Sequence, residues 1–438
     1  FTLISKTNKG FFTTTVTLKA SVTQMKQVLI IGGGAAGLMA AISAAQHGAK
    51  VTILEKMKDI GRKLLITGKG RCNITNNCDL PELVKNMTGN GSFLYSAFNA
   101  FSNQDIVDFF EHAGLPTKVE RGGRVFPVSD QAKDVIKIFS KELSKLDVVV
   151  KTGQPVKNLM IKDGRVAGAV TSEAEYWADA VILATGGASY PGTGSSGDGY
   201  RIAQAVGHSI VPIKPSLVPL EVEEDWIKEL QGLSLKNVTA TVISSGKKAA
   251  DDFGEMLFTH YGLSGPIILS LSRKVSELFL TAPGQEVSIE INLKPALSIE
   301  TLDKRLQRDF TKFARKQLKN SLNELLPSKL IPVVIDLSFI DPDKFVHQIT
   351  KEERIRLLEV LQHLTFTISR TRPVAEAIVT AGGVSTKEIN SRSMESKIVP
   401  GLFFAGEVID IDGFTGGFNL QAAFSSGYVA GKYAATSS

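Results

Sequence analysis

The strongest constraint on the fold is a complete strand–helix–strand unit close to the start of the chain. Residues 26–31, KQVLII, are a short apolar run rich in β-branched side chains, which is typical of a buried parallel strand. The glycine turn GGGAAG follows, then the helix-like run LMAAISAAQHG, and then a second apolar strand, AKVTILEK, that reaches Glu55. An acidic residue at that distance completes the pattern of a dinucleotide-binding unit. The sequence therefore predicts an α/β fold with a Rossmann-type domain.

Each glycine of the turn has a physical role in holding a dinucleotide. Gly32 permits the tight turn, Gly34 lets the backbone approach a pyrophosphate, and Gly37 lets the helix pack closely on the strand. The helix N-terminus offers unpaired N–H groups to the phosphates, and Glu55 can accept hydrogen bonds from ribose hydroxyls. A purely structural glycine turn is the alternative. The motif does not separate FAD from NAD, but its place at the start of the domain favours FAD.

Two distant glycine-rich segments indicate the same cofactor. Residues 178–187, ADAVILATGG, form an apolar strand that ends at Thr185 and Gly186. Towards the other end of the chain, GLFFAGE reaches Glu407, and GFTGGFNLQ leads into a final helix over residues 419–435. The N–H groups at the start of that helix can stabilise the negative charge of a reduced flavin. An ordinary C-terminal Rossmann helix is the alternative.

A second GxGxxG string occurs in PGTGSSGDGY, at Gly192, Gly194 and Gly197. It does not directly follow its strand, and the next strand-like run, HSIVPIKP, ends without an acidic residue for a ribose. A loop that packs on the first cofactor is therefore favoured over a separate NAD(P)H site.

The cationic segment GRKLLITGKGRCNITN, residues 61–76, leaves the end of the second strand, where ligands of an open α/β sheet bind. It is not a P-loop, because Gly70 and not Ser or Thr follows Lys69. One cysteine and two amides make a poor metal site. We interpret it as a cofactor-facing loop whose cations balance the pyrophosphate. Cys72 is expected to be a small packing residue; a redox-active thiol is the alternative.

Composition narrows the class of protein. The 438 residues are 43% hydrophobic and 21% charged, as in ordinary globular proteins, and the net charge of +6 is spread along the chain. We therefore expect a small-molecule substrate and no nucleic-acid partner. Two cysteines argue against a disulfide framework and for a reducing, cytoplasmic location. The uncharged run 28–45 is interrupted near its start by three consecutive glycines, so we expect no membrane span.

Several motifs together resemble one bacterial flavoprotein family. They are GKGRCNITN, ATGGASYPGTGSSGDGY, LFTHYGLSGP and GLFFAGEVIDIDGFTGGFNLQAA, and the resemblance spans about residues 25–435. The family is described as NAD(P)/FAD-dependent oxidoreductases, with aminoacetone-oxidase-like and bile-acid-reductase-like members. The resemblance implies a Rossmann-type FAD-binding domain made from both chain ends, with an inserted β-barrel-like domain and a small helical domain.

The resemblance also implies a set of cofactor contacts. Lys69 stands where the family more often has glycine. Thr185 and Gly186 of the ATGG segment, with Val156, are further predicted contacts. The positions that carry over from the family are Gly32, Gly34, Gly37, Glu55, Lys56, Lys63, Arg71, Cys72, Asn73, Gly406, Glu407, Gly417, Phe418, Asn419 and Leu420.

We expect the following division of the chain. Residues 1–24 are expected to form a mobile tail that was either added to the protein or translated from sequence upstream of it. The alternative is a short arm that belongs to the protein. The alternating runs KNVTATVISS and QEVSIEINL predict strands of the insertion, NSLNELL and ITKEERIRLLEVLQHL predict helices, and AGGV at 381–384 predicts a turn. The FAD-binding domain takes residues 25–215 and 370–438, the β-rich insertion 216–295 and 330–369, and the helical subdomain 296–329 with 351–364.

Candidates for the chemistry are few, because a flavin brings its own redox chemistry. His260 and Tyr261 lie in a glycine-bounded loop of the insertion that could reach the flavin, and Arg124 could bind a substrate carboxylate. Purely structural roles are the alternatives. We expect no metal. The predicted function is an FAD-dependent oxidoreductase for a small molecule, with NAD(P)H as a transient electron donor. The alternatives are an oxygen-using oxidase of small amines and an FAD-containing protein that binds a macromolecule or is associated with RNA modification.

Overall fold

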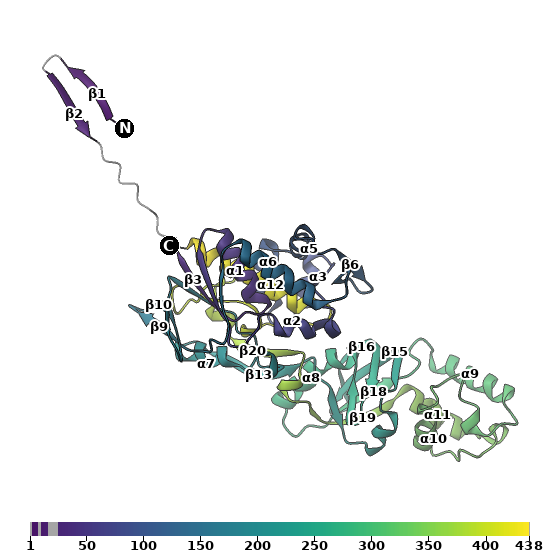
Figure 1. The fold of residues 1–438 in the computed structure, drawn as a ribbon. Coiled ribbons are helices and arrows are strands. Elements are labelled where there is room, and N and C mark those ends of the chain that lie inside the picture. The colour runs from purple at the N-terminus through teal and green to yellow at the C-terminus, as the bar shows by residue number, and fades with distance from the viewer. Residues whose placement is uncertain (1, 8–9, 16–24, 438) are drawn as a thin grey trace.

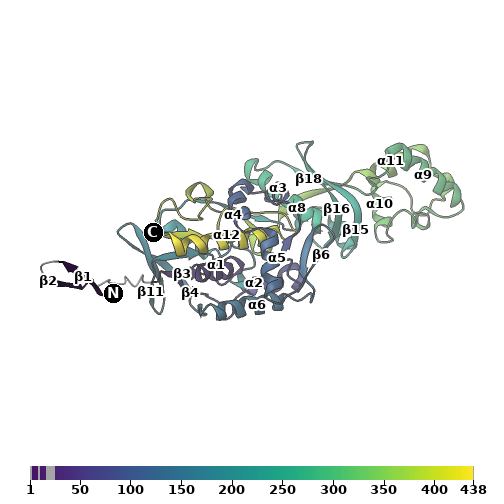
Figure 2. The same cartoon turned by 90° about the horizontal axis from the view of Figure 1, so that it is seen from above.

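The computed structural model describes residues 2–7, 10–15 and 25–437. β1 (Thr2–Thr7) and β2 (Gly10–Thr15) pair as an antiparallel hairpin. The expected mobile tail depends on residues 1, 8–9 and 16–24, which lie outside the described residues, so it stays a prediction. From residue 25 on, an α/β part, a β-barrel and a group of helices follow one another along the molecule (Figure 1). Figure 2 shows the same order from above.

The α/β part is built on a parallel sheet of five strands in the order β21-β12-β3-β4-β8. All four neighbouring pairs are parallel. β12 and β21 are buried along their whole length, as their unbroken apolar sequences predict. The strands are β3 (Gln27–Ile31), β4 (Lys50–Leu54), β8 (Val149–Lys151), β12 (Ala180–Leu183) and β21 (Leu402–Phe404).

Two helices from opposite ends of the chain pack against each other beside this sheet: α1 (Ala35–Gln46) and α12 (Phe418–Thr436) (Figure 1). The contact depends on glycines, since a Cβ at Gly427 would lie 2.3 Å from the carbonyl oxygen of Ala36. The uncharged run 28–45 is divided between β3 and α1 by the glycine turn. No helix in the described part of the chain is long and apolar enough to cross a bilayer.

A long connection between β4 and β8 carries the cationic segment. Its strands β5, β6 and β7 form a small antiparallel sheet in the order β5-β7-β6. The elements are α2 (Arg62–Ile66), η1 (Thr67–Gly70), β5 (Thr75–Asn76), α3 (Leu80–Lys85), η2 (Gly91–Leu94), α4 (Tyr95–Ala100), α5 (Asn103–His112), β6 (Thr117–Glu120), β7 (Arg124–Pro127) and α6 (Ala132–Lys145).

A three-stranded antiparallel sheet, β11-β10-β9, and the strand pair β13–β20 complete the α/β part. β13 leads into the barrel and β20 returns from it. The elements are β9 (Val156–Lys162), β10 (Arg165–Thr171), β11 (Glu175–Trp177), η3 (Pro191–Thr193), α7 (Asp198–Ala205), β13 (Ile210–Ser216), η7 (Val374–Glu376), β20 (Val379–Val384), η8 (Thr386–Glu388) and η9 (Gly406–Val408).

The inserted part is a closed six-stranded barrel, β14-β17-β16-β15-β18-β19, with α8 packed against β16. Beyond it lies the helical group (Figure 1). The elements are β14 (Leu220–Val222), η4 (Asp225–Leu230), β15 (Ser234–Ser244), β16 (Lys247–Phe258), β17 (Gly262–Ser264), α8 (Pro266–Thr281), β18 (Val287–Asn292), α9 (Ile299–Lys312), η5 (Leu318–Asn320), α10 (Leu330–Leu337), η6 (Val346–Gln348), α11 (Lys351–Gln362) and β19 (Leu364–Thr371).

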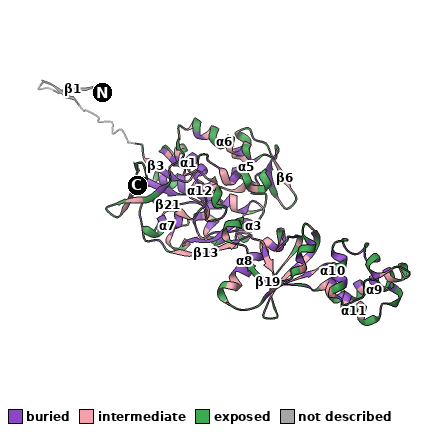
Figure 3. Ribbon diagram, turned by 60° about the horizontal axis from the view of Figure 1, so that its bottom comes forward, coloured by how far each residue is buried: buried purple, intermediate pink, exposed green. Residues whose placement is uncertain are grey.

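The buried residues form two separate hydrophobic cores. The ribbon coloured by burial shows buried residues in both the α/β part and the inserted part (Figure 3). One core is drawn from residues 28–203 and 384–434, and the other from residues 220–368. Because each core is closed by its own secondary structure, we propose that the α/β part and the inserted part are distinct folding domains. The boundaries expected within the insertion stay a prediction.

Two local predictions were wrong. NSLNELL, residues 320–326, does not form the expected helix: Asn320 ends η5 and residues 321–326 lie in turns and irregular backbone. Pro327 disfavours helical backbone at Leu326 and so prevents a helix from continuing through the end of the segment. The AGGV segment is not a turn but lies in β20, opposite an irregularity in the register of β13. There a Cβ at Gly382, whose φ is +86°, would lie 2.3 Å from the carbonyl oxygen of Pro212. The glycines therefore serve a strand irregularity.

Candidate functional site

A cavity of about 1540 Å³ extends from the glycine turn after β3 to the start of α12. Ordinary ligand pockets measure about 300–1,000 Å³, so this cavity has room for a dinucleotide together with a substrate. Most of the cofactor contacts predicted from the sequence line it. They are Gly32, Gly34, Glu55, Lys56, Lys63, Arg71, Asn73, Val156, Thr185, Gly186, Gly406, Glu407, Gly417, Phe418, Asn419 and Leu420. Gly37 and Cys72 do not line it.

The glycine turn has the geometry that a dinucleotide requires. Gly32 adopts a φ of +107°, and a Cβ there would lie 2.5 Å from the carbonyl oxygen of Ala184. A Cβ at Gly34 would meet no atom within 4 Å, so the bare backbone faces open space. A Cβ at Gly37 would lie 1.9 Å from the carbonyl oxygen of Gly32, which explains its role in packing. The three glycines thus shape a cradle without obstructing it.

Glu55 follows the last residue of β4 and is 9% exposed at the edge of the cavity. Its two carboxylate oxygens accept hydrogen bonds from the backbone N–H groups of Gly33 and Met57, both at 2.7 Å. These bonds hold the carboxylate beside the glycine turn. Each oxygen retains a further lone pair that can accept a hydroxyl.

Three of the predicted cofactor cations are already paired with carboxylates. Lys56 Nζ lies 2.5 Å from Asp198 Oδ2, and Lys63 Nζ lies 2.7 Å from Glu407 Oε2. Arg71 is bonded to Glu120 and Asp130 and covers the ring of Phe126. We expected these side chains to balance the charge of a pyrophosphate. The structure does not support this, because each of them already has a carboxylate partner. Arg62 and Lys69 line the cavity and have no ion-pair partner among the described residues.

The segment after α2 turns through left-handed backbone. Lys69 has a φ of +59° and Cys72 a φ of +62°. Left-handed backbone favours glycine, so Lys69 adopts a conformation that a glycine at this position would adopt at lower cost. The Cys72 thiol is fully buried, and burial raises its pKa to about 12. Cys72 is therefore a protonated packing residue, as expected, and not a thiolate at neutral pH.

Two buried polar atoms at the cavity have no hydrogen-bond partner among the described residues. They are Asn73 Oδ1 and Thr185 Oγ1, and both residues line the cavity. A buried polar atom is normally hydrogen-bonded, so both atoms are suited to contact a polar ligand. Together with the open cradle at Gly34, they fit the predicted FAD.

The loop before α12 is fixed at both ends. Asn419 accepts a hydrogen bond from the Gly413 N–H at 2.9 Å and donates one to the Gly413 carbonyl at 2.8 Å. Gly417 has a φ of +101°, and a Cβ there would lie 2.3 Å from the carbonyl oxygen of Thr75. This close approach directs the N-terminus of the 19-residue helix towards the cavity that Gly417 and Phe418 line.

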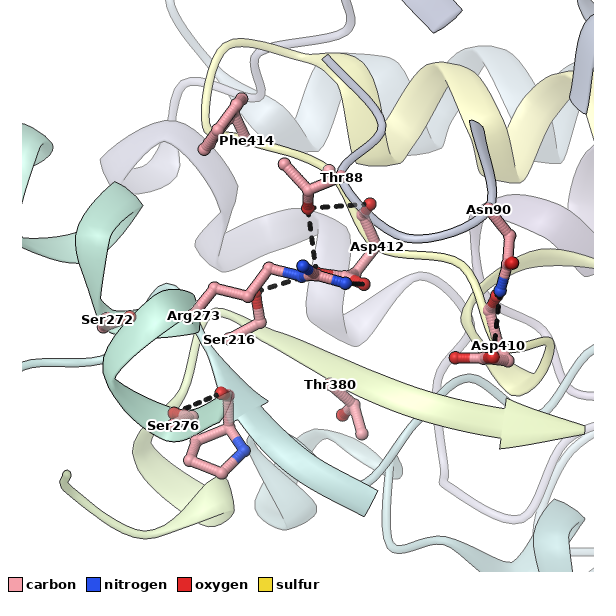
Figure 4. Close-up of polar contacts among 12 residues, drawn as sticks. Thr88, Asn90, Ser216, Ser272, Arg273, Ser276, Thr380, Asp410, Asp412 and Phe414 are labelled. Carbon is pink, nitrogen blue, oxygen red and sulfur yellow. Dashed lines mark hydrogen bonds and ion pairs between the residues drawn. The ribbon is translucent and has the colours of Figure 1, made fainter. Parts of the chain in front are cut away.

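A buried carboxylate that the sequence interpretation missed anchors the same loop (Figure 4). Asp412 is 1% exposed and accepts hydrogen bonds from Arg273 Nε of α8 at 2.8 Å, Ser216 Oγ at 3.0 Å and Thr88 Oγ1 at 3.2 Å. Ser216 is the last residue of β13, which leads into the barrel, and Arg273 belongs to α8 of the inserted part, whereas Asp412 precedes the glycine loop. The ion pair thus joins the inserted part to the wall of the cavity. An acidic residue directly before the glycine-rich GFTGG was the available sequence signal.

The three catalytic candidates are not brought together. Arg124 lines the cavity, but His260 and Tyr261 do not. The ring of Tyr261 lies 4.8 Å from the His260 ring and is covered by the guanidinium of Arg372. The geometry therefore supports Arg124 and gives no support to the other two, whose roles stay predictions. Gly194 of the second GxGxxG lines the same cavity, in keeping with a loop packed on the first cofactor.

The chain matches the family described as HI0933-like protein Rossmann domain over residues 26–433. It belongs to this family. The HI0933-like chain is 33% identical over 422 residues to a 3-dehydro-bile acid delta(4,6)-reductase of Clostridium scindens, covering 94% of this chain and 99% of that relative. It is 33% identical over 410 residues to a ribosomal RNA dihydrouridine synthase of Haemophilus influenzae, covering 92% and 97%.

Among solved structures, the open conformation of a flavocytochrome c3 fumarate reductase has the same fold, with a TM-score of 0.51 at 18% identity over 95% of this chain and 79% of that one. The family membership confirms the predicted Rossmann-type α/β fold with its barrel and helices. It also confirms the predicted enzyme class, an FAD-dependent oxidoreductase.

Proposed function

We propose that this HI0933-like protein reduces a carbon–carbon double bond conjugated to a carbonyl group in a small molecule, with NAD(P)H as a transient electron donor. The observation that carries the proposal is the relative named a 3-dehydro-bile acid delta(4,6)-reductase, which aligns over nearly the whole of both chains. That name denotes a substrate with a ketone at position 3 of the bile acid and with double bonds at positions 4 and 6, which are conjugated to the ketone. Conjugation makes such a bond an acceptor of hydride, because the carbonyl oxygen takes up the negative charge.

The residues of the cavity suit this reaction. Bound FAD would supply the redox chemistry. Gly34 and Glu55 would hold its nucleotide end, and Asn73 and Thr185 offer polar atoms that need a partner. The apolar side chains Leu217, Ile378, Val379 and Phe414 line the cavity as well, and would bind an apolar substrate and exclude water.

Charge at the start of α12 supports the same assignment. The unpaired N–H groups and the positive end of the helix dipole stabilise negative charge nearby by about 0.3–1 kcal/mol when exposed, and more when buried. Gly417 and Phe418 at this N-terminus are buried. Negative charge that develops on a carbonyl oxygen in the cavity would therefore be stabilised by the protein backbone.

A second candidate substrate is a uracil base in RNA. It is favoured by the relatives named ribosomal RNA dihydrouridine synthase, from Haemophilus influenzae and Escherichia coli, each 33% identical to this chain. The double bond of uracil that becomes saturated in dihydrouridine is likewise conjugated to a carbonyl group. The two candidates therefore share a reaction type and differ in the molecule that carries the double bond. The small-amine oxidase stays a prediction.

Stopped-flow absorbance of the flavin tests the proposal. FAD-loaded protein is reduced anaerobically with NADH or NADPH and then mixed with a 3-oxo-delta-4 bile acid, with a uridine-containing ribosomal RNA fragment, or with buffer. We expect the bile acid to restore the oxidised flavin spectrum within a turnover. A bile acid without the double bond is the matched control, since it has no bond to reduce. Reoxidation by RNA alone would select the second candidate.

Two other outcomes would contradict the proposal. One is reoxidation by oxygen only, with no response to either double-bond substrate. The other is reduction of oxidised flavin by small amines but not by NADH or NADPH, which would favour the amine oxidase.

A further inference from the structure

The turn between β6 and β7 is fixed at one end of the cavity. Asn76 Nδ2 donates to the carbonyl of Gly122 at 2.9 Å and to the carbonyl of Gly416 at 3.0 Å. A Cβ at Gly123, whose φ is +73°, would lie 2.5 Å from Asn76 Oδ1. Because Gly416 directly precedes the α12 N-cap Gly417, the turn sits where α12 begins.

This turn carries arginines into the cavity lining. Arg121 and Arg124 both line it. Arg121 has no carboxylate within ion-pair distance among the described residues. Arg124 Nε donates to the Arg121 carbonyl at 3.1 Å, and its nearest carboxylate oxygen, on Glu120, is 3.9 Å away. Glu120 already accepts two hydrogen bonds from Arg71. The charges of Arg121 and Arg124 are therefore poorly compensated by the protein.

The other end of the cavity has its own means of binding phosphate. The Gly61 N–H donates to the carbonyl of Gly33 at 2.8 Å, so α2 starts beside the glycine turn. Arg62, the first residue of α2, lines the cavity there and has no ion-pair partner among the described residues. Arg62 and the glycine turn can therefore bind a pyrophosphate without a contribution from the β6–β7 turn. The arginines of the β6–β7 turn are then available to bind a different anion.

Apolar side chains line the cavity next to the arginines of the β6–β7 turn. The Phe414 N–H donates to the carbonyl of Asn86 at 2.9 Å, and Met87 follows Asn86. All three residues line the cavity, and Phe414 lies two residues before Gly416. The cavity therefore has an apolar surface at Met87 and Phe414 that lies next to the two cations of Arg121 and Arg124.

We propose that Arg121 and Arg124 bind an oxyanion group of the substrate, a carboxylate or a phosphate, and so orient its apolar body along the wall at Phe414. Arginine binds such groups through paired, charge-assisted hydrogen bonds. This inference rests on the proposed function, because it takes the double-bond substrate as the ligand of the cavity. It adds that this substrate is an anion.

Matched pairs of ligands test the inference without turnover. Isothermal titration of the oxidised, FAD-loaded protein compares a 3-oxo-delta-4 bile acid with its methyl ester, and uridine monophosphate with uridine. We expect the charged member of one pair to bind at least about ten-fold more tightly, as one charge-assisted hydrogen bond predicts. The double variant Arg121→Gln with Arg124→Gln should lose this preference, while its affinity for the neutral member and its flavin absorbance stay unchanged.

The control is Arg392→Gln, an exposed arginine outside the cavity lining, which should keep the preference. A preference in the bile-acid pair assigns a carboxylate, and one in the uridine pair assigns a phosphate. Equal binding within both pairs, or a preference that survives in the double variant, overturns the inference. If the double variant loses its flavin, the single variant Arg121→Gln repeats the titration, since this side chain is exposed and makes no hydrogen bond to another described residue. Failure of the proposed function is seen separately, as a reduced flavin that no double-bond substrate reoxidises.

Discussion

At the scale of single residues, Asp412 is a buried carboxylate that joins three segments of the chain. Arg273, Ser216 and Thr88 all donate to it, and it is almost completely buried. We expect Asp412→Ala to lower the free energy of unfolding by about 3–5 kcal/mol, because Arg273 is left partly buried without its counter-ion. Urea unfolding measures this. Ser216→Ala removes one neutral donor and should cost about 1 kcal/mol. Equal losses in the two variants would contradict this account.

His208 makes stability depend on pH. Its side chain is fully buried against Phe404, with Nδ1 3.2 Å from Glu388 and Nε2 2.8 Å from Ser396 Oγ. Burial lowers the pKa of the imidazole below 6.5, and Glu388 offsets this only in part. The unfolded chain therefore binds more protons as pH falls through about 6.5, so His208 makes folding less favourable at acidic pH and has no such effect above that pH.

Urea unfolding between about pH 7.5 and 5.5 tests this, since that interval spans the ordinary histidine pKa. His208→Gln should show a smaller loss of stability on acidification than the unchanged protein. The same slope in both proteins would remove His208 as the cause.

At the scale of elements, the contact between α1 and α12 holds the two chain ends of the α/β part together. A Cβ at Gly431 would lie 2.2 Å from the carbonyl oxygen of Ala40. Gly431→Ala should therefore lower the free energy of unfolding by about 1–3 kcal/mol through overpacking, although alanine favours helix by about 1 kcal/mol over glycine. Lys432→Ala, at the exposed neighbouring position, is the control for helix propensity. Stabilisation by Gly431→Ala, measured by thermal unfolding, would mean that the helices can separate at no cost.

At the scale of the whole molecule, the two hydrophobic cores predict two unfolding transitions in calorimetry. The cavity is lined mainly by the α/β part, with Leu217 directly after β13 and Pro266 at the start of α8 in addition. Added FAD should raise the transition of the α/β part alone, because a ligand stabilises only the unit that binds it. Arg354→Gln, which breaks the 2.6 Å contact to Asp303 in the helical group, should lower the other transition alone. One transition that moves in both experiments would show that the cores unfold together.

The sequence by itself determined the Rossmann unit and the class of cofactor. The apolar runs 28–31 and 180–183 have no polar face, which is typical of strands in a buried parallel sheet. Gly32, Gly34 and Gly37 then restrict the turn to one that a dinucleotide can approach. These are local constraints of backbone and side-chain pattern, which do not depend on distant parts of the chain.

Only the tertiary structure decided which charges are available at the site. The sequence predicts that Lys63 and Arg71 are free to bind a pyrophosphate. In the structure Lys63 forms an ion pair with Glu407 and Arg71 with Glu120, and both carboxylates are distant along the chain. Arg121 has no carboxylate partner among the described residues, and Asn76 holds its turn against the start of α12. The closed barrel likewise leaves His260 outside the cavity lining. Ion pairing falls off steeply with distance, so the partner of each charge follows from the packing of remote segments and not from spacing along the chain.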